Sequence, residues 1–355
     1  MIQSIGMAAF SAREPLVPWE FTRREPGPRD VVIDIEYCGI CHSDLHTVRA
    51  EWGKVDFPVV PGHEIVGTVH ALGEDVTRFK PGERVGVGCL VDSCRTCSAC
   101  RQHMEQYCTT GNTWTYDSIE KETGRPTQGG YSLNIVVTED FVLRVPGSLD
   151  PAAAAPLLCA GTTTWSPLVH HGVGQGSRVG VVGLGGLGHM AVRLAAAMGA
   201  EVLVFTRSEN KVADAKRLGA AQVVVGEGRG SLNHYRESLD FIVDTVSAPH
   251  DLEYEMRMLR LDGSLCLVGV SPEAHAMPRA STFIGRRRSI TGSLIGGIRE
   301  TQEMLDFCGQ HNISADIELI SADYINTAYD RMLRSDVKYR FVMDVATLKG
   351  AVATV

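Results

Sequence analysis

Residues 179–191 read V-G-V-V-G-L-G-G-L-G-H-M-A and decide the fold of the second half of the chain. The apolar run before this turn, residues 178–182, predicts a buried strand, and the apolar spacing over residues 189–200 predicts a helix. Between them, Gly183, Gly185 and Gly188 form a G-x-G-x-x-G pattern. The first glycine permits a tight turn, the second admits a pyrophosphate, and the third lets the helix pack on the strand. The stretch therefore predicts a dinucleotide site whose phosphates lie at a helix N-terminus.

The residues that follow continue the same alternation. Strands are expected at 201–205, 222–225, 239–246 and 264–270, with helices at 210–218 and 252–261. Alternating strands and helices of this kind form a doubly wound parallel sheet.

The end of the second strand indicates which dinucleotide binds. An NAD enzyme would carry an acidic residue about 20 residues after the glycines, for the ribose hydroxyls. The chain has Arg207, Ser208 and Lys211 there instead, which favour the 2′-phosphate of NADP(H). The alternative is that Arg207 and Lys211 form a solvated helix face.

Residues 1–158 are β-rich, with short alternating runs at 31–37, 65–71 and 133–137. They predict a barrel-like domain with long loops, followed by a cofactor domain at 159–297. The tail, 298–355, offers helices at 299–310 and 324–334 and a strand at 339–345, and we expect it to rejoin the first domain.

Composition excludes several classes of protein. The 355 residues carry 34 Lys+Arg against 42 Asp+Glu, a net charge of −8, which argues against a nucleic-acid binder. The N-terminus lacks a basic segment followed by an apolar core, and no apolar run approaches about 20 residues. We expect a cytoplasmic protein without a membrane segment.

Four of the ten cysteines, Cys94, Cys97, Cys100 and Cys108, lie within one short stretch. Two-residue gaps let neighbouring thiolates converge on one ion, and the longer loop returns the fourth ligand to close a tetrahedron. Four thiolates leave no open position, so a structural zinc site is predicted. An iron–sulfur cluster is the competing interpretation, but its usual last spacing and following proline are absent.

Further ligand types occur in C-G-I-C-H-S-D-L-H at 38–46, in P-G-H-E at 61–64 and at Cys159. A catalytic zinc needs three protein ligands and a free position, and two cysteines with one histidine are an accepted set. Taken singly, His63 or Cys159 is more often a packed core residue.

Together these motifs resemble the zinc-dependent medium-chain alcohol dehydrogenases, and within them the cinnamyl-alcohol-dehydrogenase-like NADP(H) aldehyde reductases. The resemblance spans essentially the whole chain and includes W-T-Y near 114, T-Q-G-G-Y near 130, C-A-G-T-T-T at 159–164, I-T-G-S-L-I-G near 294 and Y-R-F-V-M-D near the end. It implies an α/β protein with a GroES-like β-barrel catalytic domain and a Rossmann cofactor domain.

The resemblance also implies roles for individual residues. Cys41, His63 and Cys159 would hold the catalytic zinc, and Glu64 would become a ligand when the open position empties. The zinc would act as a Lewis acid on the aldehyde oxygen while the nicotinamide supplies the hydride. Ser43 and His46 would relay the proton through the cofactor ribose.

Further cofactor contacts are expected along the chain, with Thr163 packing on the nicotinamide. The others are His42, Gly186, Leu187, Thr206, Val246, Val268, Val270, Ser293 and Ile295. By positional likeness the substrate pocket would be lined by Trp52, Cys89, Trp114, Leu294 and Ile295. An apolar pocket with two indoles suits aromatic or medium-chain aliphatic aldehydes. Each of these residues could equally be ordinary core.

The leading hypothesis is a zinc-dependent NADP(H) alcohol dehydrogenase that interconverts primary alcohols and aldehydes, with two zinc ions per chain and a small-molecule aldehyde or alcohol as its partner. A polyol or secondary-alcohol dehydrogenase using NAD(H) is one alternative, and a non-enzymatic zinc protein on the same fold is another. The resemblance further implies a homodimer formed through the sheet edge near 289–296.

Overall fold

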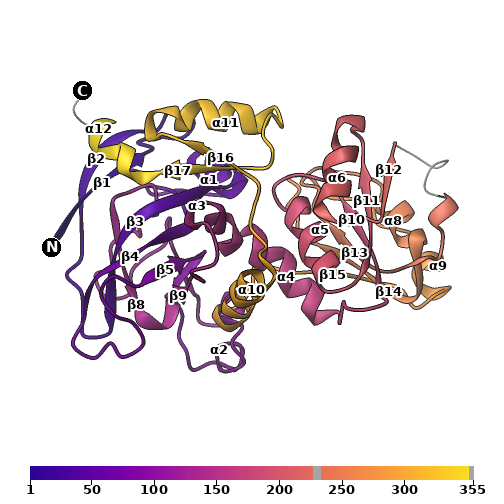
Figure 1. Ribbon diagram of the computed structural model, residues 1–355, viewed down its shortest axis with the longest axis horizontal. Helices are drawn as coiled ribbons and strands as arrows, with labels where there is room; N and C mark the ends of the chain where they lie inside the picture. The colour runs from indigo at the N-terminus through magenta and orange to yellow at the C-terminus, as the bar shows by residue number, and fades with distance from the viewer. Residues whose placement is uncertain (227–232, 352–355) are drawn as a thin grey trace. The chain divides into compact units, whose positions relative to one another are not determined.

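The computed structural model describes residues 1–226 and 233–351, and the chain divides into two compact units. The first unit comprises Met1–Cys159 and Gly297–Val355, and the second comprises Ala160–Gly296 (Figure 1). No helix in the described ranges is both long and apolar enough to cross a membrane.

The second unit contains a six-stranded parallel sheet with the strand order β12-β11-β10-β13-β14-β15. The order reverses between β10 and β13, and in such sheets the ligand binds beyond the carboxyl ends of the strands at this point. The strands are β10 (Arg178–Val182), β11 (Glu201–Thr206), β12 (Gln222–Val225), β13 (Leu239–Asp244), β14 (Leu259–Leu267) and β15 (Ser289–Gly292).

Apolar residues on both faces make these strands the interior of the unit. Val181 of β10 is fully buried and pairs with Val204 on one side and Val243 on the other. Strands that are buried on both faces need helices above and below the sheet. Among the described residues of this unit, the helices are α4 (Ala160–His170), α5 (Gly188–Ala197), α6 (Val212–Leu218), α8 (Leu252–Met258) and α9 (Ala280–Ile284).

The largest difference from the predicted element boundaries lies between α8 and β14. The helix expected over 252–261 ends at Met258, and β14 begins at Leu259, well before the expected residue 264. Leu259 is extended and fully buried, and it pairs with Leu239 of β13. Burial of this leucine in the sheet outweighs the helical pattern of the residues before it.

The first unit is built on a seven-stranded sheet in which β3 (Asp30–Ile40) is central. Strand β3 pairs with β17 (Arg340–Asp344), β4 (Ile65–Leu72) and β8 (Asn134–Thr138), all antiparallel. Figure 1 shows β3, β4 and β5 side by side. The other strands of this unit are β1 (Ile2–Ala8), β2 (Val17–Arg23), β5 (Arg84–Val87), β6 (Leu90–Asp92), β7 (Thr113–Trp114), β9 (Leu143–Arg144) and β16 (Ile317–Ile320).

The tail contributes structure to this first unit. Its strands β16 and β17 join the sheet beside β3, and its helix α10 packs on β9. The helices of the first unit are α1 (His42–Val48), α2 (Ser98–Arg101), α3 (Pro151–Ala154), α10 (Ile298–His311), α11 (Ile325–Leu333) and α12 (Leu348–Ala351).

Candidate functional site

Strand register in the first unit brings together residues that are far apart in the sequence. In the β3–β4 pair Cys38 faces Ile65, so Cys41 just after β3 lies near His63 and Glu64 just before β4. Cys159 follows the 3₁₀ helix Ala155–Leu158, which packs on β3 and β4. The ligand atoms of Cys41, His63, Glu64 and Cys159 all lie within 4.8 Å of one another, and all four residues are buried. Two thiols and one imidazole beside a carboxylate form a donor set that fits zinc.

A buried carboxylate orients the histidine of this cluster. Asp44 is fully buried, and its Oδ1 lies 2.9 Å from Nδ1 of His63. The same carboxylate accepts hydrogen bonds from the Cys41 and Gly62 amides and from the Tyr131 hydroxyl. A carboxylate on Nδ1 fixes the tautomer and leaves Nε2 free to bind a metal. Sequence reasoning missed Asp44, although its place three residues after Cys41, at the start of α1, was a visible signal.

Glu64 is paired with a buried arginine from the tail. Arg340 begins β17, and its Nη2 contacts Oε1 of Glu64. The second oxygen of Glu64, Oε2, is buried and has no hydrogen-bond partner. Burial raises the pKa of Glu64, and Arg340 opposes this shift. Arg340 was not predicted, because its partner lies far away in the sequence.

A third thiol adjoins the cluster. Cys89, expected in the substrate pocket, is buried beside Cys159, and a hydrogen bond between the two thiols lowers the pKa of Cys89. The pKa of Cys41 is lowered as well, chiefly by a hydrogen bond from Cys159. The same two hydrogen bonds raise the pKa of Cys159. Of the two cysteine ligand candidates, Cys41 therefore carries the thiolate character that zinc binding requires.

The residues expected to relay a proton, Ser43 and His46, lie on α1. The Sγ atom of Cys41 lies 3.6 Å from the Ser43 hydroxyl. His46 is three residues further along the helix, where its Nδ1 lies 2.5 Å from Oε2 of Glu51 and its ring stacks on Trp52. Trp52 is 53% exposed within this chain, in contrast to the buried Cys89.

Leu294 and Ile295 of the expected pocket belong to the second unit, whereas Trp114 forms β7 in the first. Because the expected residues are divided between the two units, their grouping into one substrate pocket stays a prediction.

The four remaining cysteine ligands form a compact lobe in the first unit. The ligand atoms of Cys94, Cys97, Cys100 and Cys108 lie within 4.8 Å of one another. The Cys97 amide donates to Sγ of Cys94 and the Cys100 amide donates to Sγ of Cys97. Hydrogen bonds from the Thr110 hydroxyl and from backbone amides lower the pKa of Cys94 to about 5. Backbone amides also lower the pKa of Cys97, to about 7, whereas burial raises the pKa of Cys100. Four converging thiols, two of them stabilised as thiolates by backbone donors, fit a structural zinc site.

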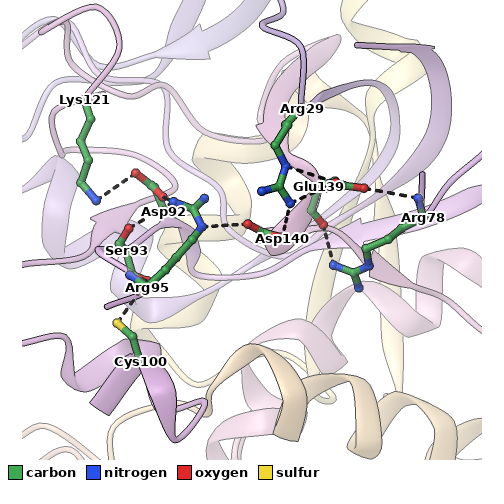
Figure 2. A network of polar contacts seen from close by, with 9 residues as sticks. All are labelled: Arg29, Arg78, Asp92, Ser93, Arg95, Cys100, Lys121, Glu139 and Asp140. Carbon is green, nitrogen blue, oxygen red and sulfur yellow. Dashed lines mark hydrogen bonds and ion pairs between the residues drawn. The ribbon is translucent and has the colours of Figure 1, made fainter. Parts of the chain in front are cut away.

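Ion pairs anchor this lobe to the body of the unit (Figure 2). Arg95, in the loop between two of the cysteines, pairs with Asp92 at 2.7 Å and with Asp140 at 2.8 Å. Lys121 pairs with the other oxygen of Asp92 at 2.9 Å. Arg29, which directly precedes β3, joins the same network through its ion pair with Asp140.

The glycine-rich turn of the second unit has the geometry of a phosphate-binding turn. Gly183 has φ +86°, in the left-handed region that favours glycine. A side chain on Gly188 would lie 2.2 Å from the Gly183 carbonyl, so only glycine allows α5 to begin here. A side chain on Gly185 would meet nothing within 4 Å, which leaves open space at the turn. A dinucleotide pyrophosphate fits such an open glycine turn at a helix N-terminus.

A lysine from the short 3₁₀ helix that follows β11, Glu209–Lys211, reaches this turn. Nζ of Lys211 lies 2.8 Å from the carbonyl of Leu184, between the first two glycines. Ser208 donates its amide to the Thr206 hydroxyl, and Arg207 is exposed. The structure thus brings Lys211 to the glycine-rich turn.

The other cofactor residues that were predicted in the second unit lie mainly at the carboxyl ends of strands. Val246 follows β13, Val268 and Val270 follow β14, and Ser293 follows β15. Thr163 lies on α4 and is buried. His42 belongs to the first unit, where burial lowers its pKa.

Sequence profiles of two families match the chain. The profile of the alcohol dehydrogenase GroES-like domain matches residues 27–147, and that of the zinc-binding dehydrogenases matches residues 186–310. These matches confirm the predicted combination of a GroES-like domain with a Rossmann-like domain.

Full-length similarity supports the same assignment. The chain is 54% identical to aldehyde reductase YahK of Escherichia coli (strain K12) over 348 residues, which cover 98% of this chain and 99% of that protein. It is 53% identical to NADP-dependent alcohol dehydrogenase C of Mycobacterium tuberculosis over 341 residues, covering 96% and 98% of the two chains. The crystal structure of a cinnamyl alcohol dehydrogenase from Helicobacter pylori complexed with NADP(H) superposes with a TM-score of 0.91 at 45% identity, covering 97% and 99%.

Proposed function

The chain belongs to the zinc-binding alcohol dehydrogenases, and on this premise we propose that it reduces aromatic and medium-chain aliphatic aldehydes to primary alcohols with NADPH, and catalyses the reverse reaction. The observation that carries the proposal is the buried cluster of Cys41, His63, Glu64 and Cys159 in the first unit. Its chemistry is that of an open zinc site, in which two thiolates and an imidazole leave one position for substrate.

When bound, a zinc ion would supply Lewis acidity toward the carbonyl oxygen, and NADPH would supply the hydride. Cys41, His63 and Cys159 would hold this zinc. The chain's own residues do the rest. Asp44 holds His63 in one orientation, since Nδ1 is bound to its carboxylate. Arg340 balances the charge of Glu64 in the buried site.

The proton required for alcohol formation is proposed to pass through Ser43 and His46. Ser43 adjoins the zinc-ligand candidate Cys41, and His46 reaches the unit's surface, where its ring is 25% exposed. Replacing His46 with Ala should lower kcat and change its pH profile, while added imidazole should restore part of the rate. The matched control is His70→Ala, because His70 is an exposed histidine that also pairs with a carboxylate. Unchanged turnover and pH profile in His46→Ala would reject the relay.

The preference for NADP(H) is proposed to come from Arg207, Ser208 and Lys211. Lys211 already lies at the glycine-rich turn. Strand β11 ends without an acidic residue, which an NAD enzyme would use to bind the two ribose hydroxyls. The test is the initial rate of cinnamaldehyde reduction with NADPH and then with NADH under identical conditions. Fast turnover with NADPH alone is expected, and equal efficiency with both cofactors would overturn this part of the proposal.

A homodimer and a cytoplasmic location complete the proposal. Strand β15 is an edge of the six-stranded sheet, and an unpaired edge strand is a ready site for pairing with a second copy. Light scattering should give a mass near twice 38.5 kDa. All ten cysteines are free thiols, which suits a reducing compartment, and cell fractionation tests this location.

A further inference from the structure

A third group of metal-ligating side chains lies in the second unit, outside the residues assigned above. Asp244 ends β13, His250 lies in the following loop, and Glu255 is on α8. One ligand atom from each lies within 4.8 Å of the others. Nε2 of His250 is 2.9 Å from Oδ2 of Asp244 and 2.9 Å from Oε1 of Glu255.

The two ion pairs of His250 account for only part of this group. Nε2 of His250, Oδ2 of Asp244 and Oε2 of Glu255 are buried and have no hydrogen-bond partner of acceptable geometry. The side chains of Asp244 and Glu255 are 1% and 6% exposed. Nε2 of His250 and Oδ2 of Asp244 still form an ion pair with each other, whereas Oε2 of Glu255 takes part in neither ion pair. Buried polar atoms in native proteins are nearly always satisfied, so this carboxylate oxygen indicates a missing partner.

The other ring nitrogen of His250 indicates what that partner is. Nδ1 lies 2.8 Å from the Ala248 carbonyl, which accepts its proton. With a metal ion between the three side chains, a neutral imidazole would turn its Nε2 lone pair to the ion, as a metal-ligating histidine does. Without the ion, the same nitrogen carries a proton and forms the two ion pairs. A protonated His250 would neutralise only one of the two carboxylates, whereas a divalent cation with a neutral imidazole neutralises both.

We propose that Asp244, His250 and Glu255 bind a third metal ion, a divalent cation of the zinc type. One imidazole and two carboxylates are ligands that zinc accepts. His275 is placed to supply a fourth ligand, because its ring lies 4.9 Å from that of His250 and its Nδ1 is buried without a partner. The ion would join the carboxyl end of β13 to α8.

Such an ion would stiffen the segment next to the predicted cofactor residues. The other oxygen of Asp244, Oδ1, accepts the amide of Val246 at 2.9 Å. The hydroxyl of Thr245 donates to the carbonyl of Val182, just before the glycine-rich turn. Metal occupancy would therefore hold the loop after β13 in place.

The test counts zinc in the purified full chain. Wild type, His250→Gln and Glu255→Gln are dialysed against the same zinc solution, freed of excess metal and measured by mass spectrometry, with His70→Gln as the matched surface control. The proposal expects one zinc fewer per chain in each cluster variant and no loss in the control. The measured quantity is the difference in zinc content between each variant and wild type. This difference stays the same even if the two cysteine-containing clusters bind no zinc.

Equal zinc content in wild type and in both cluster variants would overturn the proposal, because His250 would then serve as an imidazolium between two carboxylates. If His250→Gln does not fold, the comparison rests on Glu255→Gln, which keeps the side-chain volume. Thermal unfolding of the metal-depleted chain with and without Zn²⁺ is the second measurement. The zinc-dependent rise in Tm should be smaller in Glu255→Gln than in wild type.

Discussion

The carboxylate of Asp44 lies 2.9 Å from Nδ1 of His63, and both side chains are buried. The same spacing joins Asp34 to His70 on the surface, where both side chains are about 60% exposed. The chain therefore contains two aspartate–histidine pairs with the same contact in opposite surroundings. The buried pair acts on the proposed catalytic zinc, and the exposed pair is its natural control.

Replacing Asp44 with Asn should weaken zinc binding at the buried cluster. An amide keeps the shape but no longer selects the tautomer that leaves Nε2 of His63 free, and loss of such a partner typically costs about 10- to 100-fold in metal affinity or activity. Zinc retention against a chelator and kcat/KM for cinnamaldehyde measure the effect. Asp34→Asn should change neither quantity, and equal losses in the two variants would contradict the assigned role of Asp44.

Replacing Arg340 with Met should destabilise the first unit by about 3–5 kcal/mol, because it leaves Glu64 as an unpaired buried charge. Burial raises the folded-state pKa of Glu64 above its ordinary value of 4.5, so in this variant stability is greatest at low pH and falls as pH rises above about 4.5. The free energy of unfolding of this variant, measured with denaturant at pH 5 and pH 8, should be lower at pH 8. The double variant Arg340→Met/Glu64→Gln should lose most of this pH dependence, and a destabilisation that does not change with pH would count against the pair.

Replacing Cys94 with Ser should remove one zinc per chain and lower Tm, with the buried cluster left intact. The four thiols close one tetrahedral site, and a structural zinc contributes directly to folding free energy. Cys308→Ser is the matched control, since Cys308 is a buried cysteine outside all three clusters of metal-ligating residues. The Cys308→Ser variant should keep the wild-type zinc content, even if its Tm changes. Full zinc content in Cys94→Ser would show that the lobe does not need this thiol.

Replacing both Arg207 and Lys211 with Ala should raise KM for NADPH about 10- to 100-fold, the loss expected when one charge-assisted hydrogen bond of about 1.5–3 kcal/mol is removed. KM for NADH should change much less, because NADH lacks the 2′-phosphate. Arg217→Ala on α6 is the control: it removes a cation from the same region that pairs with Asp214. Equal increases in KM for both cofactors would mean that these cations do not recognise the phosphate.

Sequence patterns were sufficient where the structural cause is local. The glycine-rich turn, the buried strands around it and the four-cysteine lobe each depend on residues within about 20 positions of one another, and backbone geometry links such residues directly. The helix predicted over 252–261 shows the limit. Leu259, near its predicted end, pairs with Leu239 of β13 in the sheet, and the spacing of apolar residues along the chain does not predict that contact.

The sequence by itself determined the alternation of strands and helices in the second unit, the glycine turn that opens α5 and the thiol lobe, because apolar periodicity and short ligand spacings carry that information. Only the tertiary structure decided which distant groups meet. The register of β3 against β4 and β17 brings Cys41, His63 and Arg340 together, and the end of β13 brings Asp244 to His250 and Glu255. Buried charges acquire partners only when strands pair across long separations, and no local pattern specifies that pairing.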